Sequence, residues 1–497
     1  MKGDFSRNTF DPSRSFTRVL MQQGRVQIDA DTNEQTAIFW HFMRGLGQDL
    51  IGPHGGPADD LGYGITSNGD PGSFQIGPGR YYVQGLLCEN RAPMDYDDQD
   101  DYPLPEEGKL EANQPYLIYL DAWERHLTYV QDDAIREVAL GGPDTASRAR
   151  LVAQVKAIPL RDAPQGAGEQ AKKLQEMYAE LRRLILARQQ ARKDEKWTEV
   201  IGLEYQIQAR EQELEKLCQA FFGALLAHLG KKVGARLKAR TPEQSAPDDP
   251  CILPPDARYR GAENQLYRVE IHRGGKAGGF NGATFKWSRE NGSVVFPLRA
   301  PLAGGDGDTT LVSLEHLGRD DRLGLRVGDW VEVVDDDQVL QARAEGLLRV
   351  IEVDRVEKRV TLEGQLPAET GQDMDKHPLL RRWEQKARDD EELRGGARPV
   401  VEEEAWLDLE DGVQIQFRKD GTYQTGDYWL IPARTELGDV WLPFDRRGAP
   451  DGIDHAYAPL ALIATGEGGV VRDDVVDCRR SFEALARPVV RPARELG

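Results

Sequence analysis

A proline-free segment of about 70 residues interrupts a chain whose other segments resemble β structure. Residues 169–238 contain no proline and are rich in Gln, Glu, Lys, Arg and Leu, a composition that favours long helices. The segment carries two apolar stripes: Leu174, Met177, Leu181 and Leu184, then Val200, Leu203, Ile207, Leu214, Leu217 and Phe221. Val200 lies 26 positions after Leu174, which is not a multiple of seven, and the polar stretch 188–196 separates the stripes. The pattern therefore predicts an antiparallel helical hairpin or coiled coil, inserted as residues 161–245.

The apolar seam of this hairpin is a candidate assembly surface, because a projecting helical pair can bundle with its own copies or wedge against a neighbouring subunit. Leu214 and Leu217 lie on the seam. We expect that replacing both with glutamate leaves the β structure folded and abolishes oligomers, since a buried unpaired charge costs several kcal/mol.

The flanking segments predict a mainly β multi-module fold. Asn291-Gly292 and Asp411-Gly412 each stand between two strand-like runs, and both dipeptides permit tight hairpin turns. Three closely spaced strands over 325–364 are typical of a small SH3-like barrel. The predicted order of domains is 1–160, a β-rich attachment domain with one helix; 161–245, the hairpin; 250–366, a β domain; 367–404, a linker; 405–485, a C-terminal β domain; and 486–497, a tail.

Residues 19–50 predict a hairpin followed by a helix. Two short apolar runs meet at Gln23-Gly24 and suggest the hairpin, over 19–29. Asp31 and Glu34 have the spacing of a capping box, so a helix should follow over 32–50. Four apolar residues recur along it at every fourth position, which predicts one apolar face: Ile38, Phe42, Leu46 and Leu50.

The charge balance excludes some partners. Lys and Arg number 64 against 84 Asp and Glu, which leaves a net charge of −20. A phosphate-binding surface needs clustered basic residues, so nucleic acid and anionic lipid are not expected as main partners. The N-terminus lacks the apolar core of a signal peptide, and no apolar run reaches the roughly 20 residues of a membrane span. We therefore expect cytoplasmic synthesis, with later release by cell lysis left open.

Signals of catalysis or of metal binding are weak. The sequence has no HExxH, GxSxG or GxxxxGK[ST] motif, and its four cysteines, Cys88, Cys218, Cys251 and Cys478, lack metal-ligand spacing. We predict no enzyme activity, no cofactor and no metal. Paired carboxylates of a glycosidase stay possible, because a distance in space sets them. Five tryptophans could form a sugar-binding platform, although their places in strands favour core packing: Trp287, Trp330, Trp406, Trp429 and Trp441.

Several stretches resemble an uncharacterised family encoded with phage-tail-like particles, the extracellular contractile injection systems. They include MKGDFSRNTFDPSRSFTRVLMQQGRVQIDADTNEQ, IGPGRYYVQGLLCEN, ATFKWSRENGSVV and WLDLEDGVQIQFRKDGTYQTGDYWLIPAR, and the resemblance covers about 1–160 and 255–480. The segment VLMQQGRVQIDADTNEQ also resembles an N-terminal element of tail-fibre and baseplate proteins. The resemblance implies a place in such a particle and a docking or capping role for five residues: Arg25, Asp29, Asp31, Asn33 and Glu34.

The function expected from these observations is that of a structural component at the baseplate or its fibre-bearing periphery. We expect a homo-oligomer, with a trimer favoured, that contacts other particle subunits. Two alternatives stay open. One is a protein that binds or cleaves cell-surface carbohydrate, and the other is a cargo or effector of the same system.

Overall fold

A computed structural model describes most of the chain. The residues described are 1–104, 108–142, 144–162, 167–229, 234–242, 259–279, 281–385, 393–401, 405–437, 439–441, 448–467, 469–470 and 475–484. Cys251 and the predicted tail 486–497 lie outside them.

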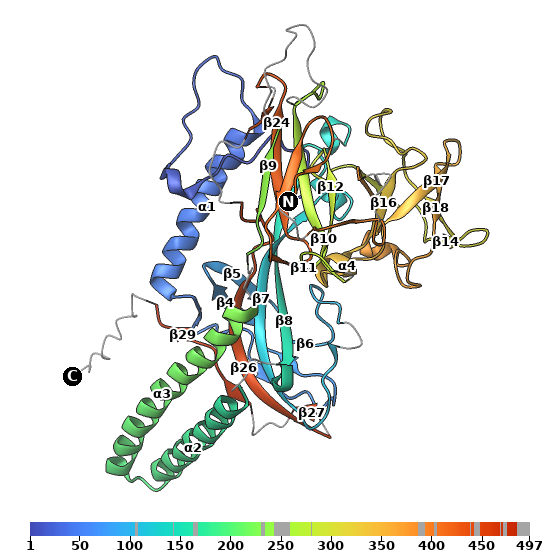
Figure 1. Ribbon diagram of the computed structural model, residues 1–497. Helices are drawn as coiled ribbons and strands as arrows, with labels where there is room; N and C mark the ends of the chain where they lie inside the picture. The colour runs from blue at the N-terminus through green and yellow to red at the C-terminus, as the bar shows by residue number, and fades with distance from the viewer. Residues whose placement is uncertain are drawn as a thin grey trace. The chain divides into compact units, whose positions relative to one another are not determined.

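The fold is mainly β, as predicted, with several sheets and an inserted pair of helices (Figure 1). Its internal contacts form two compact units, each built from three separated segments. Unit 1 comprises Met1–Trp40, Glu124–Arg150 and Lys232–Asp454, and unit 2 comprises His41–Trp123, Leu151–Lys231 and His455–Gly497. The N-terminal 160 residues therefore contribute to both units. The domain limits predicted from the sequence stay predictions.

Unit 1 contains four sheets. Its five-stranded sheet has the order β20 (Arg398–Pro399), β12 (Thr284–Ser288), β10 (Gln265–Arg273), β24 (Tyr428–Arg434) and β25 (Asp439–Val440). Its seven-stranded sheet has the order β13 (Val295–Pro297), β19 (Leu379–Trp383), β16 (Trp330–Val334), β17 (Leu348–Asp354), β18 (Arg359–Glu363), β15 (Thr309–Ser313) and β14 (Ala303–Gly304). The smaller sheets are β11 (Gly275–Lys276) with β23 (Thr422–Tyr423), and β21 (Leu407–Asp408), β22 (Gln414–Phe417) and β9 (Leu237–Arg240).

The three strands predicted within 325–364 are present as β16, β17 and β18, which are antiparallel neighbours. They form the middle of the seven-stranded sheet. The segment 367–404 was predicted as a linker, and this is wrong for β19, a strand that pairs with both β13 and β16. Two arginines, Arg381 and Arg382, give β19 the sequence composition of a surface segment. One of them, Arg382, is buried beside Glu384 and donates to the carbonyl of Gly324, so its charge is paired inside the fold.

The two predicted hairpins of unit 1 have different outcomes. β21 pairs with β22 across Asp411-Gly412, as predicted. Asn291 and Gly292 also adopt positive φ in a turn. However, β12 before this turn pairs with β10 and β20, whereas β13 after it pairs with β19. The turn therefore connects two sheets, and the predicted pairing of its flanks is wrong.

The strands of unit 2 form three sheets, and an apolar core lies among them. The first has the order β29 (Ser481–Phe482), β1 (His54–Pro57), β4 (Gly79–Val83) and β5 (Leu86–Asn90), and the second has β2 (Ile65–Thr66), β3 (Gln75–Ile76) and β6 (Met94–Asp95). The third has β27 (Gly469–Val470), β26 (Ala456–Gly466), β7 (Pro115–Leu127) and β8 (Arg148–Pro159), with β28 (Val476–Asp477) also paired to β26.

The predicted helical hairpin is confirmed in unit 2 as α2 (Ala167–Lys193) and α3 (Trp197–Leu229), which run side by side (Figure 1). Ion pairs show that the helices are antiparallel, since Arg192 pairs with Glu204 near the turn and Arg210 pairs with Glu180 farther away. The apolar seam of the hairpin is covered by the chain itself. Most of its residues belong to a buried cluster that also contains Leu117, Leu462 and Val476 of the sheet strands.

Helix α1 (Asp29–Ile51) begins earlier than predicted and crosses from unit 1 into unit 2 between Trp40 and His41. Asp31 therefore lies inside the first turn and not at the N-cap. A turn forms at Gln23-Gly24, but the flanking residues 19–28 form no strands, so the predicted hairpin is wrong. The remaining helices are short: α4 (Asp336–Leu340), η1 (Pro12–Arg14), η3 (Asp133–Ile135), η4 (Val138–Leu140), η5 (Leu160–Asp162) and η6 (Met374–Lys376). Among the described residues, no helix has the length and apolar character needed to span a membrane.

Candidate functional site

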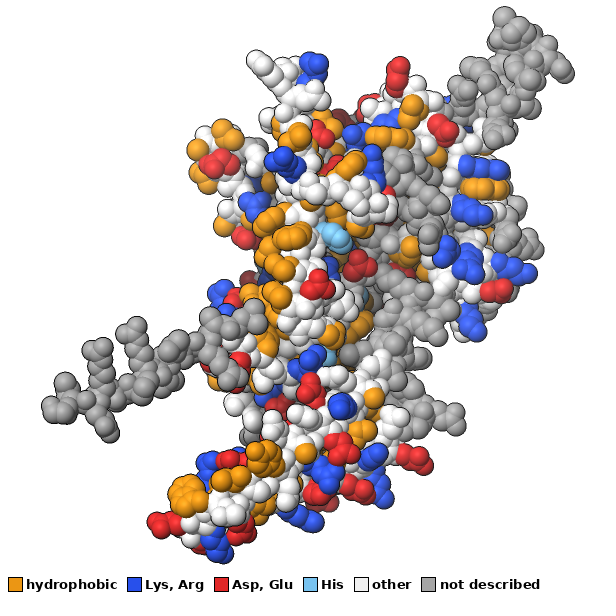
Figure 2. Space-filling model, turned by 90° about the vertical axis from the view of Figure 1, so that its left-hand side faces the viewer, with side chains coloured by type: hydrophobic (Ala, Val, Ile, Leu, Met, Phe, Trp, Pro, Cys, Tyr) orange, Lys and Arg blue, Asp and Glu red, His pale blue; other side chains and the backbone are white. Residues whose placement is uncertain are grey.

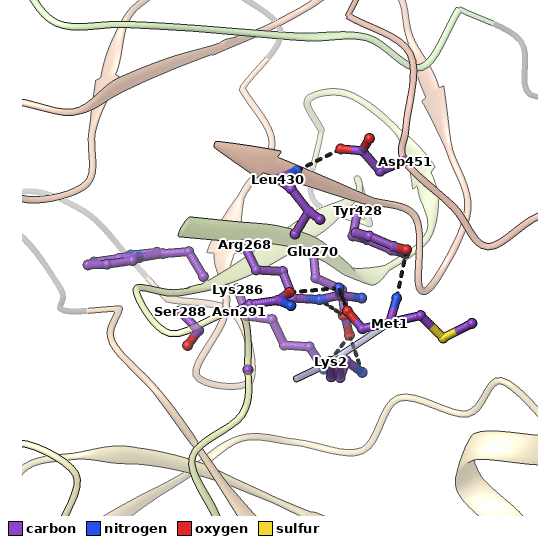
Figure 3. A network of polar contacts seen from close by, with 12 residues as sticks. Met1, Lys2, Arg268, Glu270, Lys286, Ser288, Asn291, Tyr428, Leu430 and Asp451 are labelled. Atoms are coloured by element: carbon purple, nitrogen blue, oxygen red, sulfur yellow. Dashed lines mark hydrogen bonds and ion pairs between the residues drawn. The ribbon is translucent and has the colours of Figure 1, made fainter. Parts of the chain in front are cut away.

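The first seven residues form an arm outside any helix or strand, and it is anchored on the five-stranded sheet of unit 1 (Figure 3). The Met1 amino group donates to the hydroxyl of Tyr428 at 2.7 Å, and the Met1 carbonyl accepts from Arg268 at 3.1 Å. The side-chain amide of Asn291 donates to the carbonyl of Gly3 at 2.9 Å. This explains why the 291–292 turn is buried: its asparagine holds the arm.

A cluster of buried charges lies beneath the arm. Glu270 is within 2.9 Å of the Lys2 ammonium, 2.6 Å of Arg268 and 3.4 Å of Lys286. Lys286 also contacts Glu332 at 2.6 Å, and the indole of Trp383 donates to Glu332 at 2.9 Å. These residues come from the arm and from β10, β12, β16 and β19, so their contacts tie the arm to two sheets.

The cluster keeps both carboxylates ionised. Burial opposes ionisation of Glu270, but Lys2, Arg268 and Lys286 outweigh it and hold the pKa of Glu270 well below its ordinary value. In the same way, burial of Glu332 is outweighed by Lys286, His272 and Lys2, and its pKa is about 2. These ion pairs stabilise a fixed position of the arm on the sheet.

Acid is therefore expected to weaken unit 1. The pKa of Glu332 falls from its ordinary 4.5 to about 2 on folding, so its contribution is present above about pH 4.5 and is lost as the pH falls toward 2. The full shift corresponds to a contribution on the order of 3 kcal/mol at neutral pH. Urea unfolding midpoints measured between pH 7 and pH 3 check this. Glu332→Gln should lower the midpoint at pH 7 and flatten its decline with acid, and an equally steep decline in the variant would contradict the assignment.

A cavity of about 260 Å³ lies beside the arm. Residues 3–7 form one wall, and Ile28, Asn264–Leu266, Glu290 and Arg434 form the rest. Burial, followed by the negative charges of Glu384 and Asp4, raises the pKa of Glu290 to about 7. Arg322 contacts Glu290 at 2.7 Å, so this carboxyl also has a partner within the chain.

Residues at the start of α1 hold the segment that follows the arm. Asp29 accepts from the backbone amide of Ser6 at 2.9 Å, and Glu34 accepts from the hydroxyl of Thr9 at 2.5 Å. Gln35 accepts from the amide of Val19 at 2.9 Å. Asp29 and Glu34 thus contact the N-terminal segment of their own chain. The docking role implied for these two and for Arg25, Asp31 and Asn33 stays a prediction, and Arg25 and Asn33 are exposed.

Exposed apolar side chains gather on the loop before α1 and along α1. Of the twenty-one large hydrophobic side chains exposed among the described residues, eleven fall within residues 16–50. Those of the loop are Phe16, Leu20, Met21, Val26 and Ile28. Those of the helix are Phe39, Trp40, Phe42, Met43, Leu46 and Leu50. Figure 2 shows hydrophobic side chains gathered on this side of the molecule. Such a concentration of apolar surface is typical of a protein–protein contact site.

The apolar series predicted for α1 is largely exposed. Ile38 is buried, but Phe42, Leu46 and Leu50 of the same four-residue series are exposed by 63%, 40% and 64%. In unit 2 the helix instead packs through its polar side, where Arg44 and Gln48 donate to the carbonyl of Gln84. Periodicity locates an apolar face but does not say whether the chain itself covers it.

The hairpin residues predicted for assembly lie elsewhere. Leu214 is 6% exposed within the core that α2 and α3 share with the sheet, and Leu217 is partly buried against it. Their assembly role stays a prediction that the buried position of Leu214 does not favour. Among the described side chains of α3, the large apolar ones that are exposed lie near its start, at Trp197, Ile201 and Tyr205.

The residues considered for sugar or metal binding are also placed by the structure. Trp287 and Trp429 are buried in the core of unit 1. Trp406 is covered by Arg240 and Trp441 by Arg7, while Trp330 packs against a small cluster around Trp383. Within the described ranges, His, Cys, Asp and Glu side chains form no group of three suited to a metal ion. Cys88, Cys218 and Cys478 are buried and free.

Comparisons with known proteins add one firm relationship. No curated protein sequence matches this chain. A solved structure titled "Crystal structure of TssK" aligns with 84% of this chain and 99% of its own at 9% identity, but the TM-score of 0.17 is too low to equate the folds. The model of a protein family described as "Family of unknown function (DUF6519)" matches residues 1–479. The chain therefore belongs to the DUF6519 family.

Proposed function

We propose that this protein is a structural component of a phage-tail-like contractile injection particle, located at the baseplate or its fibre-bearing periphery. It acts by protein–protein assembly and not as an enzyme. It is made in the cytoplasm, enters the particle there as a homo-oligomer, and leaves the cell with the particle on lysis.

The observation that carries this proposal is the apolar surface on residues 16–50. Exposing this many large apolar side chains to water is unfavourable, so their concentration in one stretch of the chain favours a covering partner. Part of this surface is held within the chain, since the amide of Val19 donates to Gln35 of α1, which limits the conformational entropy lost on assembly. The resemblance of the N-terminal sequence to tail-fibre and baseplate elements supports the same location.

Deleting the gene tests the proposal. Negative-stain images of particles from the deletion strain should lack density at the baseplate or its periphery, and the intact gene should restore it. Quantified subunits should show a fixed copy number that matches a particle symmetry. Unchanged particles, or sub-stoichiometric protein in the tube lumen, would instead indicate a dispensable protein or a cargo.

A further inference from the structure

The cavity of about 260 Å³ beside the arm is lined by two arginines, Arg7 of the arm and Arg434 at the end of β24. Arg434 holds the arm, since its guanidinium donates at 2.6 Å to the carbonyl of Ser6, the residue before Arg7. It also donates to the carbonyls of Gln265 and Ala433, both at 3.0 Å. Burial and then the charge of Arg7 lower the pKa of Arg434, as expected for two cations close together. All residues that line the cavity belong to unit 1.

Neither arginine has a carboxylate in contact with it among the described residues. The Nε atom of Arg7 is buried without a hydrogen-bond partner in this part of the chain, and its guanidinium stacks on the Trp441 ring at 4.3 Å. The described partners of Arg434 are all neutral carbonyl oxygens. Asp29 attracts Arg434 from a distance, but its side chain accepts from the amide of Ser6. Because buried polar and charged groups are stable only with partners, the two guanidiniums favour an anion as the ligand of this cavity.

The rest of the lining indicates the kind of anion. Three apolar residues line the cavity: Phe5, Ile28 and Leu266. Since a dry cavity of about 150 Å³ holds benzene, this one has room for a ring or a branched group together with a carboxylate. Asp4 and Glu290 also line it, and Glu290 is paired with Arg322 at 2.7 Å. Nearby carboxyl groups disfavour an anion of higher charge, such as phosphate.

We propose that this cavity binds a small organic carboxylate whose apolar body is about the size of a benzene ring. The carboxylate lies between the guanidiniums of Arg7 and Arg434, because the planar fork of an arginine matches two carboxylate oxygens. The apolar body packs on the apolar part of the lining. The inference goes beyond the proposed function and does not depend on it.

The ligand is coupled to the position of the arm. Residues 3–7 form one wall of the cavity, and residues 264–266 on the sheet side form another. The complete site therefore exists only while the arm is docked, and a ligand that binds only the docked state stabilises that state by mass action. The anchoring of the arm thus depends on the concentration of the carboxylate.

Isothermal titration calorimetry of the full-length chain tests the proposal with three acids: 3-methylbutanoate, benzoate and phenylacetate. At least one should bind with a dissociation constant below about 1 mM. Its neutral amide lacks the charge and inorganic phosphate lacks the apolar body, so both should bind roughly tenfold more weakly or worse. The absence of binding by all three acids at about 10 mM, or equal affinity for the amide or for phosphate, overturns the proposal.

Replacing one arginine tests the position of the carboxylate. Arg7→Gln should weaken binding of the acid roughly tenfold or more, because one of the two guanidiniums is lost. Arg14→Gln is the matched control, since Arg14 also stacks on a ring, that of Phe16 at 4.3 Å, but does not line the cavity. Circular dichroism checks that both variants are folded. Equal affinities in the two variants overturn the assignment of Arg7.

Filling the cavity tests the position of the apolar body. Ile28→Trp occupies part of the cavity and leaves both arginines in place, so it should weaken binding. Val26→Trp enlarges an exposed side chain outside the cavity and should not. This pair also decides the question if Arg7→Gln disturbs the arm, because an acid that binds Ile28→Trp as tightly as the wild type does not occupy the cavity.

Hydrogen exchange tests the coupling to the arm. With the acid at about nine times its dissociation constant, exchange of the amides of residues 3–7 through release of the arm should slow about tenfold. Residues 16–26 do not line the cavity, so their exchange should not change. An acid that binds but leaves the exchange of residues 3–7 unchanged overturns its position against the arm.

Discussion

Replacing Leu214 with glutamate is expected to unfold the helical pair where it meets the sheet of unit 2. Leu214 is buried in a cluster with Phe222 of α3, Leu174 of α2 and Leu462 of β26. A carboxylate there loses the leucine's apolar contacts and is placed among buried apolar side chains, which together cost about 4 kcal/mol or more. This outcome differs from the sequence-based expectation that the substitution leaves the fold intact and affects assembly alone.

The matched control lies on the same helix. Ile201 is 55% exposed, so Ile201→Glu should change the urea unfolding midpoint very little. Circular dichroism and limited proteolysis of α2 and α3 compare the two variants. Proteolysis reports on the helices directly, which is useful because a chain with two compact units need not unfold in one step. Equal midpoints and equal proteolysis rates would show that Leu214 is not part of the core.

The elements governed by local sequence were predicted best. The absence of proline and the phase difference between stripes identified α2 and α3. These signals depend on neighbours in the chain, which the sequence displays directly. The strand β19 was missed because Arg381 and Arg382 resemble a surface segment until their partners in space are known.

The candidate site depends on contacts between distant residues. Lys2 pairs with Glu270, and Lys286 pairs with both Glu270 and Glu332. Nothing in the spacing of these residues shows that a terminal arm meets two sheets. The turn at Asn291 was recognised, but its function in binding the arm was not, because the bond to Gly3 spans most of the chain. Likewise, the sequence shows that α1 has an apolar face. It does not show that the polar side of the helix contacts Gln84, which leaves the apolar face exposed.

Neutralising Glu270 is expected to have the second large effect, on both stability and the arm. Its side chain is 4% exposed and contacts three cations, Lys2, Arg268 and Lys286. Glu270→Gln keeps the shape but leaves those buried cations with less negative charge, and removing one partner of a buried ion pair costs roughly 3–5 kcal/mol. The unfolding midpoint of unit 1, followed by tryptophan fluorescence, should fall accordingly.

Trypsin provides a direct reading of the arm, since Lys2 and Arg7 are both cleavage sites within it. In the wild type, Lys2 is bound to Glu270 and Arg7 stacks on Trp441. Because both cleavage sites are fixed in this way, trypsin should remove the N-terminal residues slowly. Glu270→Gln should speed the loss of residues 1–7 measured by mass spectrometry.

Asp133→Asn is the matched control, because it removes the same charge from an exposed ion pair with Arg136 of unit 1 and such pairs contribute little. Trimming at the same rate in both variants would mean that the buried charges do not hold the arm, and that its position depends on the backbone bonds to Arg268 and Asn291.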